Sequence, residues 1–210
     1  TNPDGWGEDA SLKSVSSYSE AIIWEIHVRD FSNKISTSQY KGKYLAFTEN
    51  GLVNEHGQPI GVDYLKNLGI THVHLLPVYD YASVDEASSE PQFNWGYDPA
   101  NYNVPEGSYS TDPYNGEVRI KEFKEMVMAL HKAGIGVIMD WVPAHFPKDA
   151  FGLYEFDGQP LYEYQGWDRI EHEGWGTRRF DVGREEVQSF LISNAVYWLK
   201  EYHIDALRVD

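Results

Sequence analysis

Two short sequence motifs contain the residues whose types and spacing could do chemistry. DWVPAH contains Asp140 and His145, and RVD contains Arg208 and Asp210. Both motifs lie at the end of an apolar run typical of a buried strand. Side chains two residues apart in a strand point to the same side, so Arg208 and Asp210 would face together. A guanidinium beside a carboxylate keeps the acid ionised and fixes its orientation.

An ionised and oriented carboxylate is suited to nucleophilic attack, as in the covalent glycosyl intermediate of sugar-cleaving enzymes. The alternative is that Arg208 and Asp210 form an ordinary ion pair that closes a strand end. His145 could likewise be a hydrogen-bonded structural residue of a loop. The spacing by itself leaves both alternatives open.

Four segments with short apolar runs are predicted to be strands; the second alternates polar and apolar residues, and the third is a nearly continuous apolar run. They are Ile22–Val28, Thr71–Leu76, Gly136–Trp141 and Ile204–Val209. Such runs suit strands that are covered on both faces, as in parallel sheets. His27, His72 and His74 fall within these strands without a metal-ligand pattern, and we expect them to be structural.

Helical patterns separate the predicted strands. Phe123, Met126, Val127 and Leu130 follow the i, i+3, i+4, i+7 rule and predict a helix over Glu117–Ala133, with Gly134 placed to end it. Further helices are predicted over Arg184–Tyr202 and about Val62–Leu68. The alternation indicates βαβ units in an α/β fold with parallel strands.

The pattern fits both a doubly wound sheet and a closed barrel. No GxGxxG or phosphate loop follows any strand, so the usual sign of a nucleotide-binding sheet is missing. The connections after the second and third strands, Pro77–Gly116 and Val142–Gly183, each run to roughly forty residues, whereas βα loops usually have about 2–6. Long loops at the C-terminal ends of parallel strands are where barrel enzymes keep their active sites.

The composition excludes several classes of partner. The formal net charge is −16, which would repel phosphate backbones, so we expect no nucleic-acid partner. No apolar stretch approaches the roughly 20 residues needed to cross a bilayer, so we expect no membrane partner. The absence of cysteine excludes disulfides and thiolate metal sites. The N-terminus lacks the features of a signal peptide; we expect a cytoplasmic protein, and a secreted protein whose leader has been removed is the alternative.

Together, DWVPAH and DALRVD resemble the first two signature regions of the α-amylase family of glycoside hydrolases and transglycosylases. IIWEIHVRDFS is similar to the first barrel strand of that family, and FNWGYDPANYNVPEGSYSTDP to the loop after the second. The resemblance implies that residues 21–210 form the first half, strands 1–4, of a (β/α)8 TIM barrel. Residues 1–20 would be a lead-in, and about residues 142–183 a loop insertion.

The resemblance also implies a set of roles around the sugar at which cleavage occurs. His145 would hydrogen-bond that sugar and Tyr97 would stack against it, with Asp98 as a further substrate-binding candidate. Asp140 would support this network from the third strand. The family often binds calcium through an Asn just before the histidine, but that residue is Ala144 here. We therefore expect no metal at this position and no cofactor.

In the same way, Asp210 would be the catalytic nucleophile and Arg208 its orienting partner. The family also needs a glutamic acid as general acid/base at the end of the fifth strand, and retaining hydrolysis requires two carboxyls about 5–5.5 Å apart. The sequence ends before such a residue appears. We therefore expect residues 1–210 alone to be inactive.

Two parts of the chain resemble different members of the family. Residues 1–140 resemble type I pullulanase, an α-1,6 debranching enzyme, and about residues 135–210 resemble bacterial 1,4-α-glucan (glycogen) branching enzyme. This difference suggests a chimera joined in the third strand, with an unusual natural member as the alternative. The expected ligand is an α-glucan such as glycogen, starch or pullulan.

Two functional hypotheses remain open. One is half of an α-glucan hydrolase or glucanotransferase barrel, competent only with its missing C-terminal half. The other is an engineered, non-catalytic half-barrel that binds α-glucan or forms a homodimer through its open edges. A measured molecular mass and a glucan turnover assay would separate them.

Overall fold

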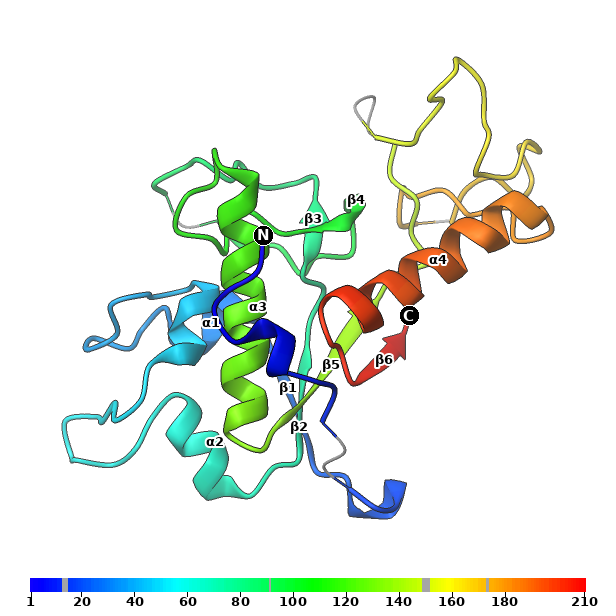
Figure 1. The fold of residues 1–210 in the computed structure, drawn as a ribbon. Helices are drawn as coiled ribbons and strands as arrows, with labels where there is room; N and C mark the ends of the chain where they lie inside the picture. Colours follow the sequence, from blue (N-terminus) through cyan, green and yellow to red (C-terminus); the bar gives the residue numbers. More distant parts are fainter. Residues whose placement is uncertain (13–14, 91, 149–151, 173) are drawn as a thin grey trace.

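The computed structural model describes residues 1–210 except 13–14, 91, 149–151 and 173, so part of the predicted loop insertion lies outside the described residues. A parallel sheet contains β1 (Ile23–Ile26), β2 (His72–Leu75), β5 (Gly136–Trp141) and β6 (Ala206–Val209). The strands are ordered β1-β2-β5-β6, as they follow one another along the chain (Figure 1). A doubly wound sheet reverses its order at a switch point, and the described strands show no such reversal.

All four predicted strands are present in this sheet, but β1, β2 and β6 are each shorter than predicted. β1 ends at Ile26, and His27 begins the short helix α1 (Val28–Ser32) as its N-terminal cap. The His27 carbonyl accepts a hydrogen bond from Phe31, and its ring nitrogen Nδ1 accepts one from the Asp30 backbone N–H at 3.4 Å. The prediction that His27 lies within a strand was therefore wrong, because its backbone carbonyl and side chain both start a helical turn.

The three predicted helices are present as α2 (Val62–Leu68), α3 (Gly116–Lys132) and α4 (Glu185–Glu201). At the start of α3, the Asn115 side chain caps the helix by accepting from the Glu117 N–H. At its end Gly134 has a φ of 77°, and its N–H donates to the His131 carbonyl while Ile135 donates to Leu130. This left-handed turn sends the chain directly into β5.

The core lies where α3 and α4 meet the sheet. Phe123 of α3 and Trp198 of α4 are both fully buried and pack edge to face, with ring centroids 5.6 Å apart. Val137 and Met139 of β5 are fully buried as well. Short 3-10 helices lie at Trp6–Glu8, Tyr18–Glu20 and Tyr44–Thr48, and the last of these packs against α3.

The long loop after β2 contains an antiparallel pair that the sequence did not predict, β3 (Tyr79–Tyr81) and β4 (Pro99–Pro105). Tyr102 of β4 connects this loop to the rest of the site. Its hydroxyl donates to the His145 carbonyl at 2.6 Å, and its own carbonyl accepts from the Trp198 indole at 2.8 Å. The loops after β2 and β5 are therefore braced against each other and against α4.

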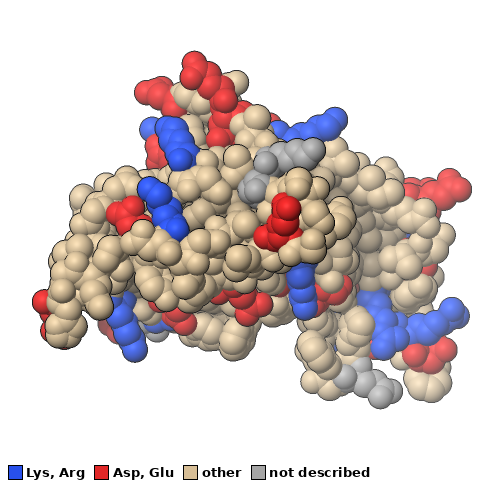
Figure 2. All heavy atoms as spheres, turned by 90° about the horizontal axis from the view of Figure 1, so that it is seen from below, with Lys and Arg blue, Asp and Glu red and all other residues tan. Residues whose placement is uncertain are grey.

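No helix among the described residues combines the length and the apolar character needed to cross a membrane. On the face shown in Figure 2, Lys and Arg side chains lie among Asp and Glu side chains and form no continuous basic patch.

Candidate active site

Asp140, near the end of β5, is the centre of the polar network at the C-terminal ends of the strands. Its side chain is fully buried and has three partners. Oδ2 accepts from the Tyr97 hydroxyl at 2.7 Å and lies 3.2 Å from His74 Nε2, and Oδ1 accepts from an Arg208 guanidinium nitrogen at 3.0 Å. A carboxylate can remain buried because such partners replace its hydration.

Arg208 connects Asp140 to Asp210. It is paired with Asp140 in the β5–β6 register, and the same guanidinium nitrogen donates to Asp210 Oδ1 at 2.7 Å. The hydrogen bond to Asp140 raises the pKa of Arg208, so the side chain is permanently charged. The Asp210 N–H donates to the Trp141 carbonyl at 3.0 Å, which fixes the backbone directly after β6. The structure thus brings Arg208 and Asp210 to one side, as the strand alternation predicted.

His145 lies on the other side of the Asp210 carboxylate. Its Nε2 is 3.5 Å from Asp210 Oδ2, and its Nδ1 is 2.7 Å from the Thr177 hydroxyl. Burial lowers the pKa of His145, and the nearby Asp210 charge opposes this only in part. A neutral ring that faces a carboxylate carries its proton on Nε2, so Thr177 donates to Nδ1.

Tyr97 and Asp98 adjoin the network from the loop after β2, but in different ways. Burial and the hydrogen bond to Asp140 raise the pKa of Tyr97, so its hydroxyl stays protonated as the donor. Asp98 accepts from the Asn94 side chain at 2.9 Å and from the Ser83 N–H at 3.0 Å. Its carboxylate therefore shapes the loop that carries Tyr97.

A hollow of about 630 Å³ opens beside these residues, between the loops after β2 and β5. Tyr97, Asp98 and His145 all line it. The six predicted site residues thus gather around Asp140 or the edge of this hollow, and Asp140 itself is buried beneath it. An open space next to an oriented carboxylate could admit a polar ring-shaped ligand.

The sequence missed two side chains that hold the network in place. His74 was expected to be structural, yet its ring bridges Asp140 and Glu25, with Nδ1 3.4 Å from Glu25 Oε2. Its position in a strand that neighbours β5 could have revealed this. Thr177, which orients His145, comes thirty-two positions later in an irregular loop, and no local pattern could have identified it.

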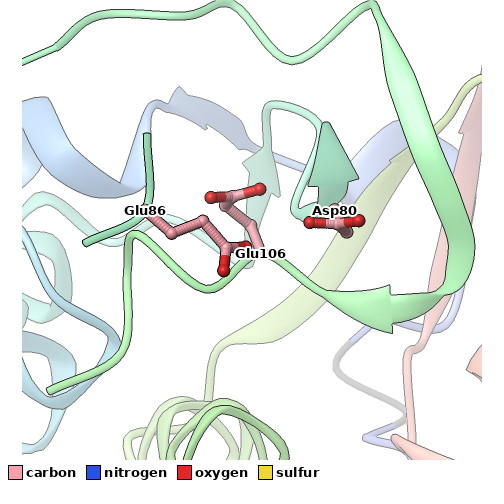
Figure 3. A group of neighbouring side chains, drawn as sticks. All are labelled: Asp80, Glu86 and Glu106. Atoms are coloured by element: carbon pink, nitrogen blue, oxygen red, sulfur yellow. The ribbon is translucent and has the colours of Figure 1, made fainter. Parts of the chain in front are cut away.

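A second group of carboxylates lies away from this site, where Asp80, Glu86 and Glu106 approach one another (Figure 3). Burial raises the pKa of Glu106 to about 7 and that of Asp80 to about 6. Arg119 already occupies this group, with its guanidinium 2.5 Å from Glu86 and 3.9 Å from Asp80. A metal ion would have to compete with that cation, so the group is best described as an ion-pair cluster.

Comparison with known proteins identifies the family. The profile described as "Alpha amylase, catalytic domain" matches residues 54–168. Pullulanase of Bacillus subtilis is 37% identical over 217 residues, covering 99% of this chain and 29% of the relative. The 1,4-alpha-glucan branching enzyme of Mycolicibacterium paratuberculosis is 49% identical over 148 residues, covering 70% of this chain and 18% of the relative. Both predicted resemblances are confirmed.

Solved structures give the same result. Pullulanase of Paenibacillus barengoltzii, in complex with maltohexaose and alpha-cyclodextrin, matches with a TM-score of 0.90 and 42% identity over 100% of this chain and 33% of that one. Pullulanase of Bacillus acidopullulyticus matches with a TM-score of 0.89 and 39% identity, over 26% of its length. The chain spans less than a third of the curated relatives. The profile match covers more than half of the chain, which therefore belongs to the alpha-amylase catalytic domain family.

Proposed function

We propose that residues 1–210 form the first half of a (β/α)8 barrel and supply the nucleophile side of an active site for α-glucans. The arrangement of the last carboxylate supports this most directly. Asp210 lies 2.7 Å from Arg208 and 3.5 Å from His145, where a parallel strand ends beside a hollow. This is the place where barrel enzymes collect their catalytic side chains.

The proposed reaction is a retaining double displacement. Asp210 Oδ2 attacks the anomeric carbon, a glycosyl ester forms, and the glycosidic C–O bond breaks with its electron pair on the leaving oxygen. Arg208 holds the other oxygen of the attacking carboxylate by a hydrogen bond, while His145 and Tyr97 border the sugar. Water or a glucan hydroxyl then attacks the ester from the opposite side, which returns Asp210 to its ionised form.

Turnover of a natural glucan needs a second carboxyl, because the leaving oxygen must receive a proton. Asp140 cannot fill this role, since it is buried and engaged by three partners. We propose that the acid comes from protein outside residues 1–210. The choice between debranching and branching then depends on whether water or a glucan hydroxyl accepts the glycosyl group.

An activated substrate separates the nucleophile from the acid. Fluoride leaves without protonation, so α-glucosyl fluoride should react with Asp210 of residues 1–210 and release fluoride in a burst no larger than the amount of chain. Asp210→Asn should release none, while Asp181→Asn, a carboxylate of the loop after β5, should match the wild type. Amylose and pullulan should remain intact in all three samples. A burst that survives Asp210→Asn, or none from the folded wild type, contradicts the proposal.

The two edges of the sheet favour a partner. β1 pairs only with β2 and β6 only with β5 among the described strands. Apolar side chains are exposed along both edges: Ile23 is 53% exposed, Trp24 38% and Val209 62%. Unpaired edges of this kind invite another strand. We propose that the remaining half of a barrel, or a second copy of this chain in its place, pairs with them.

A further inference from the structure

We propose that Trp175 forms a binding platform for a second glucosyl ring of an α-glucan, next to the ring that would react at Asp210. Nothing in the family resemblance or the motifs assigned a role to Trp175. The proposal rests on the proposed function, because it takes the α-glucan as the ligand. It adds a binding determinant contributed by the loop after β5.

The first observation is the position of the Trp175 indole against His145. The two rings are stacked, with centroids 5.1 Å apart and planes 18° from parallel. His145 is nearly buried, whereas Trp175 is 71% exposed. Exposing so much of an indole forfeits the free energy that burying it in a core would provide. An exposed aromatic face beside His145, whose own ring nitrogen faces Asp210, is suited to cover a sugar ring.

The loop holds this indole in a defined place. The backbone N–H of Trp175 donates to the His172 carbonyl at 3.2 Å, and the backbone N–H of His172 donates to the Thr177 carbonyl at 2.9 Å. His172 Nε2 also lies 2.7 Å from the Ala144 carbonyl. These hydrogen bonds connect the backbone of Trp175, through His172, to the DWVPAH motif.

A second pair of aromatic side chains lines the same hollow of about 630 Å³ as Trp175. Phe93 and Trp95 line it and pack edge to face, with centroids 5.2 Å apart. They are 47% and 58% exposed. Phe93 stacks on His27 at 4.8 Å, and the Asn94 carbonyl lies 2.8 Å from His27 Nε2, so this pair is fixed to the end of β1.

The chemistry of the lining matches a glucosyl ring. The aromatic faces suit the apolar C–H surfaces of the sugar, while Asn94, Asp98 and Ser83 add polar groups at the edge for its hydroxyls. His145 lies between the position of the reacting sugar ring and that of the second ring, because one of its ring nitrogens faces Asp210 and the ring itself borders the hollow. A chain of linked glucose units could thus occupy both positions at once.

The test measures the affinity of residues 1–210 for maltotriose by isothermal titration calorimetry. Trp175→Ala should weaken binding about tenfold, the size expected for one lost aromatic stack. Trp95→Ala, which removes another aromatic side chain of the lining, should also weaken it. Trp167→Ala is the matched control, because Trp167 belongs to the same loop, is 93% exposed and does not line the hollow; it should leave the affinity unchanged.

A second readout separates this proposal from the proposed function. α-Glucosyl fluoride carries one ring, so its fluoride burst reports Asp210 and its immediate partners. We expect Trp167→Ala to retain both that burst and the wild-type affinity for maltotriose, whereas Trp175→Ala weakens the binding of maltotriose. If the wild type binds maltotriose through Trp175 but releases no fluoride, the result contradicts nucleophilic attack by Asp210 and supports the binding role of Trp175. Two results contradict the proposed role of Trp175. One is that wild type and Trp175→Ala bind maltotriose with equal affinity, and the other is that Trp167→Ala lowers the affinity as much as Trp175→Ala does.

Discussion

At the scale of single residues, the site depends on one buried carboxylate that touches no solvent. Asp140 accepts from Tyr97 and Arg208 and lies against His74. Arg208 in turn holds Asp210. The orientation of Asp210 therefore depends on Asp140, which acts through Arg208 and is too deeply buried to touch a ligand.

Replacing Asp140 should reveal this dependence as a loss of stability. Asp140→Asn keeps the shape of the side chain but removes the negative charge that Arg208 faces. The new amide N–H groups would also lie against groups that donate to Asp140 in the wild type, such as the Tyr97 hydroxyl. We expect a loss of about 2–3 kcal/mol in the free energy of unfolding, measured by urea titration. Tyr97→Phe removes a single hydrogen bond and should cost about 1 kcal/mol. Equal stability of Asp140→Asn and wild type would show that the network contributes nothing.

The sequence predicted the Arg208–Asp210 pair, because strand alternation alone brings these two residues together. It also placed Asp140, His145, Tyr97 and Asp98 at the site, through the family motifs. It could not predict that Thr177 orients His145, since their contact at 2.7 Å joins parts of an irregular loop. Contacts of this kind depend on how loops pack, which no periodicity records.

At the scale of elements, the N-terminal segment does more than precede the parallel sheet. Trp6 is buried and stacks on His203 with ring centroids 4.0 Å apart. Asp9 lies 3.1 Å from His131 of α3, whose other ring nitrogen is 2.8 Å from Asp205. The segment thus connects the end of α3 to the start of β6. Residues 1–20 were predicted only as a lead-in, because these partners are more than 100 residues away.

His131 should make this connection dependent on pH. Burial lowers the pKa of His131, but the hydrogen bond and charge of Asp205, together with Asp9, outweigh it and raise the pKa above 6.5. When the pKa of a histidine is higher in the folded state than in the unfolded state, protonation of that histidine stabilises the fold. The stabilisation is fully present at pH values below the unfolded-state pKa and is lost as the pH rises through the folded-state pKa. We expect His131→Gln to lower the urea midpoint more at pH 6 than at pH 9.

The exposed His56 provides the control for that experiment. Its side chain is 73% exposed, so His56→Gln should leave the midpoint unchanged at both pH values. A His131→Gln effect that is the same at pH 6 and pH 9 would mean that the charge of His131 does not hold the N-terminal segment. Protection of Trp6 from fluorescence quenchers reports the docking of the segment directly.

The regular elements were predictable to within a few residues, and the antiparallel pair β3–β4 was not. α3 and α4 repeat apolar residues at helical spacing, and the four parallel strands lie in short apolar runs that contain a few polar residues. β3 and β4 instead contain Pro, Asn, Asp and Tyr and pair with register shifts. Their stability comes from tertiary contacts such as those of Tyr102 with His145 and Trp198, which override local propensity.

At the scale of the whole molecule, the open edges of the sheet and the net charge have opposite effects on association between copies of the chain. The exposed apolar residues of β1 and β6 favour association, while a formal charge of −16 makes copies repel one another. Salt screens that repulsion over distances of about 10 Å at 0.1 M. Association of residues 1–210 should therefore strengthen as salt is added.

A single edge substitution tests this expectation. Ile23→Lys places a charge on β1 and should shift the chain toward the monomer in sedimentation velocity at raised salt, because a lysine on an edge strand opposes pairing. Ile192→Lys, on α4 and 63% exposed in the wild type, adds the same charge away from both edges and should preserve association. A wild-type chain that stays monomeric at every concentration and salt level would rule out edge pairing.

The central claim is that Asp210 attacks an anomeric carbon, and covalent trapping tests it most directly. A 5-fluoro-α-glucosyl fluoride has a leaving group that needs no acid, and its second fluorine slows breakdown of the ester. After incubation with the folded chain, proteolysis and tandem mass spectrometry would locate the sugar. We expect a single glycosyl ester on Asp210, absent from Asp210→Asn. A sugar attached to any other residue, or no adduct at all, would contradict it.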